Sequence, residues 1–422
     1  MSQLGSGYYS HVPEILSTPV GFTPNRTAHL MSCTNKIISV LPTGSQIGKP
    51  NSLLTFQLAN QGWIKHGSVA LQFTFKGTQS ANSFKFAMNS ASSVIHRLSV
   101  NVGSQLIDQI NNNNVFYGNM LSHASNDSYR NSDASLTDGY NVEMKGSGAE
   151  SYDYCIPLIS GIFYNAHGRH FPSWMCGAPL QITIDTASLG MSINANTTEV
   201  TDWELTDIQL TYEQLTTDDA FNQQIRAELM NPQDPKLWRF PYSGVLGVQT
   251  TTNGAQSITF TNGVQLNSLD GVLVTGTQDD ITITATNKYF NLNSNQLITD
   301  INFIVDGVKH VQYPLKNGVK QFVELQRTLG NIFDIDQTSD LYDLVTPANS
   351  GLTKYVSERW MTGCSLRRVK DNGPCFEGIP AVNVLTQLLP TAGGAGTNTV
   401  WIFYLYTAEL QIDGLGVVKT AK

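Results

Sequence analysis

Apolar and polar residues alternate in short runs along most of the chain from about residue 50. A period of two places one side of a β-strand in the core and the other in solvent, so each run predicts a half-buried strand. The pattern therefore indicates a chain that is mostly β. In the first half of the chain these runs lie at residues 53–59, 69–75, 152–163, 178–185 and 203–215.

A hairpin followed by a short helix is predicted within the first half. The alternating run at 95–102 reaches Gly103-Ser104 and resumes at 105–110. This arrangement is typical of two strands joined by a glycine-dependent turn. Residues 115–123 then form a short amphipathic segment.

The periodicity changes from that of a strand to that of a helix near residue 217. Residues 216–219, Thr-Thr-Asp-Asp, resemble a capping box, and Asn231-Pro232 ends the element. We therefore predict a helix at 217–231 and place the boundary between two domains on it. Between these limits apolar residues recur at helical spacing, namely Phe221, Ile225 and Leu229.

The second half repeats the order of elements of the first, at an offset of roughly 200 residues. The run at 297–307 corresponds to the first strand of the hairpin, and Val308 to Val311 corresponds to its return strand. Val319 to Leu329 matches the short helix, and the runs at 380–389 and 401–413 match the two closing strands. The order of elements is thus duplicated, although the residues barely are.

Length and composition favour two β domains. A chain of 422 residues is too long for one ordinary core. Only 14% of the residues are charged, which suits β-rich surfaces. Domains of this size fit jelly rolls better than immunoglobulin-like sandwiches, and a parallel α/β fold would need more helices. We predict an all-β fold of two tandem eight-stranded jelly rolls with short helices in the connections. The expected divisions are an N-terminal arm at 1–29, a first jelly roll at 30–216, an inter-barrel helix and linker at 217–236, and a second jelly roll at 237–422.

The charge of the chain argues against nucleic acid as its main partner. The formal net charge is −8, and the first thirty residues carry one arginine and no lysine. We therefore expect no sequence-specific binding of nucleic acid. The sequence also has no signal-peptide pattern and no run long enough to span a bilayer, so we expect a soluble protein that is not secreted by this route.

Two stretches resemble metal sites but depart from the required pattern. His167-Gly168-Arg169-His170 holds two histidines in a loop without a nearby carboxylate, which is a poor ligand set. Asp334, Asp336, Thr338 and Asp340 alternate as in a calcium loop, but Ser339 replaces the glycine of the sixth position and Val345 the glutamate of the twelfth. No metal ligand is predicted.

Other candidate chemistry is equally weak. The glycines at 393–396 lack the order of a dinucleotide fingerprint, and Gly48-Lys49 is followed by a proline rather than by the rest of a phosphate loop. His96 and His310 lie on strand patterns, where histidines are most often structural. We therefore predict no catalytic residue, no cofactor-binding residue and no cofactor. The five cysteines form no C-x-x-C pair and are expected to be buried thiols: Cys33, Cys155, Cys176, Cys364 and Cys375.

The sequence resembles the double jelly-roll major capsid proteins of the adenovirus-like lineage, which includes tailless phages, virophages and polinton-like viruses. Stretches in both halves carry the resemblance through the order of their elements. In the first half they are SSVIHRLSVNVGSQLIDQINNNNVFYGNML, CIPLISGIFYNAHGRHFPSWMCGAPLQITID and TDIQLTYEQLTTDDAFNQQIRAEL. In the second half they are GCSLRRVKDNGPCFEGIPAVNVLTQLL and TVWIFYLYTAELQIDGLGVV.

The resemblance implies a structural role and no enzymatic activity. It implies a homotrimer whose six jelly rolls form a pseudo-hexagonal capsomer that tiles an icosahedral shell. The implied partners are neighbouring capsomers, penton proteins, minor or cement proteins, and an inner membrane or inner layer. The implied location is the virion, after synthesis in the host cytoplasm.

Two other functions are compatible with jelly rolls. The first is a carbohydrate-binding or spike protein, in which Trp360 and the aromatic run from Trp401 to Tyr406 would stack on sugars. The run is continuously apolar, however, which favours packing in the core or at an interface. A cupin-like enzyme would need a His-x-His motif, which the sequence lacks.

The N-terminal segment is expected to act as an assembly arm, and the alternative is a disordered tail. Pro13, Pro19 and Pro24 break any periodicity in residues 1–29. An extended segment with apolar anchors can dock on a neighbouring molecule or beneath a shell. The anchors are Tyr8, Tyr9, Val12, Ile15, Leu16 and Phe22.

Overall fold

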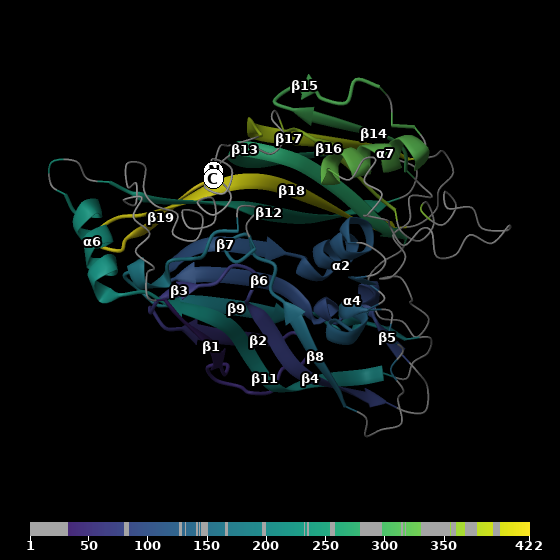
Figure 1. Ribbon diagram of the computed structural model, residues 1–422. Coiled ribbons are helices and arrows are strands. Elements are labelled where there is room, and N and C mark those ends of the chain that lie inside the picture. Colours follow the sequence, from purple (N-terminus) through teal and green to yellow (C-terminus); the bar gives the residue numbers. More distant parts are fainter. Residues whose placement is uncertain are drawn as a thin grey trace, which may run out of the picture.

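The computed structural model divides into two groups of strands, which we call the first half (residues 34–216) and the second half (residues 238–421). The two halves lie side by side, with the second half above the first in Figure 1. The structure describes residues 33–422 except 80–83, 126–128, 131, 141, 143, 145–150, 165–167, 196–199, 232, 234–235, 254–257, 279–297, 314, 317, 331–354, 356–359, 368–377 and 391–396.

The first half is a jelly roll of two main sheets. One sheet has the order β1-β11-β4-β8, with β3 beside β11, and the other has the order β2-β9-β6-β7. The first strand thus pairs with the last, and the pairs that follow are nested inside, which is a long antiparallel ribbon folded over on itself. The strands are β1 (Thr34–Val40), β2 (Leu53–Leu58), β3 (Trp63–Ile64), β4 (Ala70–Gln79), β5 (Phe84–Phe86), β6 (Ile95–Val102), β7 (Gln105–Asn111), β8 (Tyr152–Pro157), β9 (Leu180–Thr186), β10 (Ile193–Ala195) and β11 (Val200–Thr216).

The second half repeats this nesting. β12 pairs with β18, β13 with β17, β13 with β16, and β14 with β15, while β19 is added beside β18. The predicted fold class, two tandem jelly rolls, is confirmed. The strands are β12 (Trp238–Asn253), β13 (Ile258–Gln278), β14 (Ile298–Val305), β15 (Val308–Lys309), β16 (Met361–Ser365), β17 (Ile379–Pro390), β18 (Thr397–Ile412) and β19 (Val418–Ala421).

Strand β13 belongs to both layers of the second barrel. Its first part, from Ile258 to Leu269, pairs with β17, whereas its last part, from Leu269 to Gln278, pairs with β18. The register shifts where the two parts meet, and Gln265 there has a φ of 47°. Such bulges bend a strand and let it turn a barrel corner without a loop.

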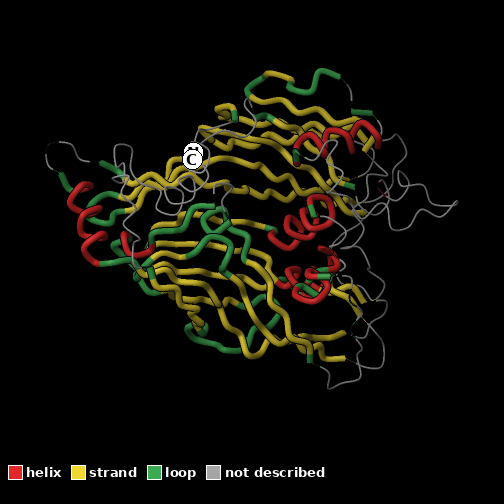
Figure 2. The backbone as a smooth tube through the Cα atoms, in the orientation of Figure 1, coloured by secondary structure: helices red, strands yellow, loops and turns green. Residues whose placement is uncertain are grey.

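Short helices occupy the two ends of the strands (Figure 2). The predicted helix between the halves is α6, and Asp218 caps it by accepting a hydrogen bond from the Ala220 N–H. The hairpin expected at 95–110 is β6 and β7, with Gly103 at a φ of 57° in its turn. The helices are α2 (Asn113–Ala124), α4 (Asp133–Thr137), α5 (Leu189–Ser192), α6 (Asp219–Leu229) and α7 (Gly318–Leu329), with 3₁₀ turns at Ala87–Asn89, Ala91–Val94 and Ser173–Met175.

Two local expectations differ from the structure, and two strands were not predicted. The strand expected at 152–163 ends at Pro157, and the chain then turns at residues 161–164. The segment expected to be amphipathic, α2, is buried on nearly all sides because it lies close to the second half, where Phe116 meets Phe403. Strands β12 and β13 had no prediction at all, although each is longer than most of the predicted strands.

Candidate functional site: the inter-barrel interface and the surface

The two halves share one continuous hydrophobic core. Three aromatic pairs cross between them, with ring centroids 5.3 to 5.8 Å apart. The Tyr242 hydroxyl of β12 also donates a hydrogen bond of 2.7 Å to the carbonyl oxygen of Ile107 in β7. Packing of this kind holds two domains in one relative orientation. The aromatic pairs are Trp63 with Trp238, Phe116 with Phe403, and Phe171 with Phe240.

Glycines let the two backbones approach closely at this interface. A Cβ on Gly161 would lie 1.8 Å from the Ser243 carbonyl oxygen, and a Cβ on Gly247 would lie 2.5 Å from the Asn111 carbonyl oxygen. At one end of the interface the Gly177 N–H donates to the Gly416 carbonyl, 2.8 Å away. The backbones of the two halves are thus in contact at these points, and neither half can move closer to the other without a clash.

A buried carboxyl group lies beside this contact. Asp108 of β7 is 1% exposed, and its Oδ2 accepts a hydrogen bond of 2.5 Å from the Ser160 hydroxyl. Burial raises the pKa of Asp108, while Ser160 and the positive charge of Lys422 act in the opposite direction. The arrangement links β7 to the turn that carries Gly161, so we interpret it as structural.

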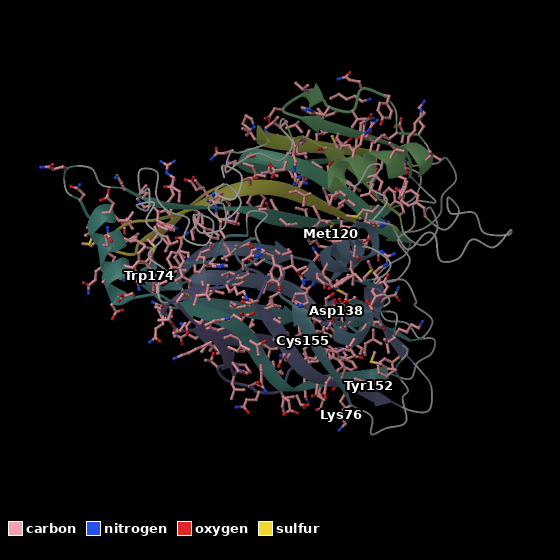
Figure 3. The ribbon with its side chains drawn as sticks, in the orientation of Figure 1. Lys76, Met120, Asp138, Tyr152, Cys155 and Trp174 are labelled. Carbon is pink, nitrogen blue, oxygen red and sulfur yellow. The ribbon has the colours of Figure 1, made fainter. Side chains whose placement is uncertain are left out.

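A second buried carboxyl group, Asp138, lies inside the first half (Figure 3). Its Oδ2 accepts a hydrogen bond of 2.6 Å from the Tyr117 hydroxyl of α2, and its Oδ1 has no hydrogen-bond partner among the described residues. Burial raises the pKa of Asp138 to about 6, although the Tyr117 hydrogen bond lowers it. Asp138 therefore changes charge at mildly acidic pH.

Replacing Asp138 with asparagine should stabilise the protein at neutral pH. Asp138 binds its proton more tightly in the folded protein than in the unfolded chain, where its pKa is near 3.8. Its contribution to stability is therefore fully present below about pH 4 and is lost as the pH rises through about 6. A pKa difference of this size corresponds to about 3 kcal/mol. The introduced asparagine should retain that stability, because its amide stays neutral and still accepts a hydrogen bond from Tyr117.

Urea unfolding of the wild type and of Asp138→Asn at pH values from 4 to 7 measures this difference. The gap in unfolding free energy should widen as the pH rises. Asp153→Asn is the matched control, because Asp153 is an exposed carboxylate on β8. Parallel curves for wild type and Asp138→Asn would show that burial of Asp138 has no energetic consequence.

The histidine loop shows no ligand set where it is described. His167 lies outside the described residues, and His170 Nδ1 accepts a hydrogen bond from the His66 N–H at 3.0 Å. Burial lowers the pKa of His170 to about 4, with smaller effects from His66 and Lys65. Within the described part of the chain, no three His, Cys, Asp or Glu side chains are grouped to hold a metal ion.

The remaining candidates have structural surroundings or lie outside the described residues. Gly48 exchanges backbone hydrogen bonds with Leu205, so its N–H is not directed at a ligand. The calcium-like residues 334–340 and the glycines at 393–396 both lie in undescribed stretches. Burial lowers the pKa values of His96 and His310, which lie on or beside strands. The described helices include none that is long and apolar enough to span a bilayer.

The expectation of buried thiols is wrong for two of the cysteines. Cys176 and Cys364 are buried, and burial raises the pKa of each to about 12. Cys155 is half-buried on β8. Cys33 is exposed directly before β1, an edge strand with most of its side chains in solvent. Cys375 lies outside the described residues.

The aromatic run considered for sugar binding is inaccessible. Trp360, Trp401, Phe403 and Tyr404 are 0% exposed, as expected for core packing. Strand β18 is buried because it runs through the middle of its sheet, between β12 and β13. These side chains therefore offer no surface for stacking on a carbohydrate.

The sequence matches no family model and no curated protein. The fold, however, is similar to that of capsid proteins over nearly the whole chain. The PBCV-1 protein VP54, which was fitted into a reconstruction of the virophage Sputnik, matches with a TM-score of 0.66 and 13% identity, over 95% of this chain and 99% of that one. The Faustovirus major capsid protein matches with a TM-score of 0.55 and 6% identity, over 92% of both chains. The mavirus major capsid protein matches with a TM-score of 0.53 and 10% identity, over 94% of this chain and 91% of that one.

Proposed function

We propose that this chain is a major capsid protein, which self-assembles as pseudo-hexagonal trimeric capsomers that tile an icosahedral virus shell. The observation that carries the proposal is the likeness in fold to the PBCV-1, Faustovirus and mavirus proteins, which extends over more than nine tenths of each chain. A likeness of this extent includes both barrels and the connection between them. It supports a role that uses the whole double barrel.

The geometry of the double barrel suits such a role. Two barrels with the same nested pairing lie side by side, and the shared core and close backbone contacts hold them as one body. Three copies around an axis would present six similar sides, so one protein could fill a hexagonal lattice. The relative orientation of the two barrels must be constant for this purpose, because otherwise the six sides would not fit one lattice.

We propose the division into an arm at 1–29, a first jelly roll at 30–216, a linker at 217–236 and a second jelly roll at 237–422. Its support is that each sheet in the described residues draws its strands from one half only. Helix α6 and the residues after it form the connection. We further propose that the protein has no enzymatic activity, and that it resides in the virion after synthesis in the host cytoplasm. Its proposed partners are copies of itself, penton and minor or cement proteins, and an inner membrane or inner layer.

The oligomeric state of the purified protein tests the proposal directly. Light scattering should give about three times the chain mass of 46.2 kDa, and negative-stain images should show hexagonal particles. A stable monomer at high concentration would contradict the capsomer. Binding to glycans by a monomer or a fibre would favour the carbohydrate-binding alternative.

A further inference from the structure

Four exposed aliphatic side chains gather at the α6 end of the molecule, and we call them the end patch. They come from the end of α6, the start of β12 and the turn between β18 and β19, which lie together in Figure 1. Isolated exposed apolar residues are common, but a group from three separate elements is typical of a surface that a further segment or molecule covers. The members are Met230 (51% exposed), Leu237 (41%), Leu415 (75%) and Val417 (50%).

The backbone fixes these side chains in their exposed positions. Asp413 Oδ1 accepts hydrogen bonds from the N–H groups of Leu415 and Val417, at 2.9 and 2.8 Å, and so locks the turn. Gly414 lies against Met230, since a Cβ there would be 2.3 Å from the Met230 side chain. Leu237 adjoins the turn because the next residue, Trp238, pairs with Ile412. The end patch is thus a built surface and not the tip of an unstructured loop.

The N-terminal segment leaves the described structure at the same end. In the register of β1 with β11, Thr34 pairs with Thr216, and α6 begins three residues later at Asp219. The described chain therefore begins at the end of the molecule that carries α6, and 32 further residues precede Cys33 in the sequence. From Phe22 to Cys33, an extended chain reaches roughly 36 Å, which is ample to cross one end of a barrel.

The composition of this segment matches an apolar surface. Residues 1–32 contain two charged side chains, Glu14 and Arg26, and several large apolar ones between residues 8 and 22. The end patch is likewise formed by aliphatic side chains. Burial of apolar area on both sides would therefore favour binding.

We infer that the end patch binds residues 8–22 of its own chain. Sequence patterns indicated an arm that docks on a neighbour or an inner layer, and the end patch is a nearer site for the same apolar anchors. The inference does not depend on capsomer formation, so it can be tested on the isolated protein.

Tryptic cleavage after Arg26 provides the first measurement, because Arg26 is the first lysine or arginine of the chain and Lys36, the next, lies within β1. Replacing Leu415 and Val417 with aspartate should release the segment and speed this cleavage about fivefold or more. The matched control is Val308→Asp with Val319→Asp, since both residues are similarly exposed, at 58% and 53%, but lie on β15 and α7. The control should cleave at the wild-type rate.

Oxidation of Met230 by hydrogen peroxide provides a second measurement that needs no substitution. It should proceed about threefold faster in a chain lacking residues 1–29 than in the full chain, because the segment would otherwise shield the thioether. Equal cleavage at Arg26 in the patch variant and the wild type, or equal oxidation of Met230 with and without the segment, would overturn the inference. Either result leaves the trimer measurement unaffected, so the two proposals fail separately.

Discussion

Replacing Gly161 with alanine should destabilise the protein by about 3 kcal/mol or more and reduce the yield of the proposed trimer. The new Cβ would lie 1.8 Å from the Ser243 carbonyl oxygen and 2.7 Å from its carbon. Ser243 cannot retreat, because β12 is paired with β18 along its whole length. The two halves must therefore separate locally, which opens the shared core. Urea unfolding and light scattering measure the two effects.

Gly263→Ala is the matched control for this prediction. Gly263 lies in β13, and the nearest atom to its added Cβ is the Asn383 side-chain oxygen at 3.7 Å, an ordinary contact. We expect a change of less than about 1 kcal/mol. If Gly161→Ala is tolerated as well as Gly263→Ala, the close approach of the halves is not a constraint on the fold.

Truncating Phe403 to alanine should cost about 3 to 5 kcal/mol, as expected for a fully buried ring. Part of that cost should come from the contact across the interface, where the Phe403 and Phe116 ring centroids are 5.3 Å apart. A double-mutant cycle with Phe116→Ala isolates this part, and we expect a coupling of about 0.5 to 1.5 kcal/mol.

Phe322 supplies the control cycle for this second prediction. Its ring packs on Tyr355 within the second half, at 5.1 Å, so Phe322→Ala should add to Phe116→Ala without coupling. Strict additivity of Phe403→Ala and Phe116→Ala would mean that the rings across the interface do not cooperate.

Elements that are determined by residues close in sequence could be predicted. The hairpin of β6 and β7 combines alternation with a turn at Gly103, and α6 combines a cap at Asp218 with apolar residues at helical spacing. Ile225 and Leu229 are indeed its buried residues. Such features depend on the chain near them, so a single sequence contains the information.

Elements defined by distant partners could not be predicted. β12 alternates only over its first few residues, because one face packs into its own barrel while the other meets β7, as the hydrogen bond from Tyr242 shows. The glycines at 244 and 247 weaken the strand signal in β12, yet a side chain at either position would collide with neighbouring atoms. Helix α2 carries asparagines that suggest a surface, although it is buried beside the other half. The inter-barrel interface was missed for the same reason.

Strand β13 makes the two layers of the second barrel mechanically continuous. In the first barrel the corresponding corner is a connection between β2 and β4 that contains the short strand β3. In the second barrel one strand of 21 residues passes through both layers. A force applied to one layer is therefore transmitted along this strand to the other layer, because no loop lies between them. The second barrel should therefore be the stiffer of the two barrels.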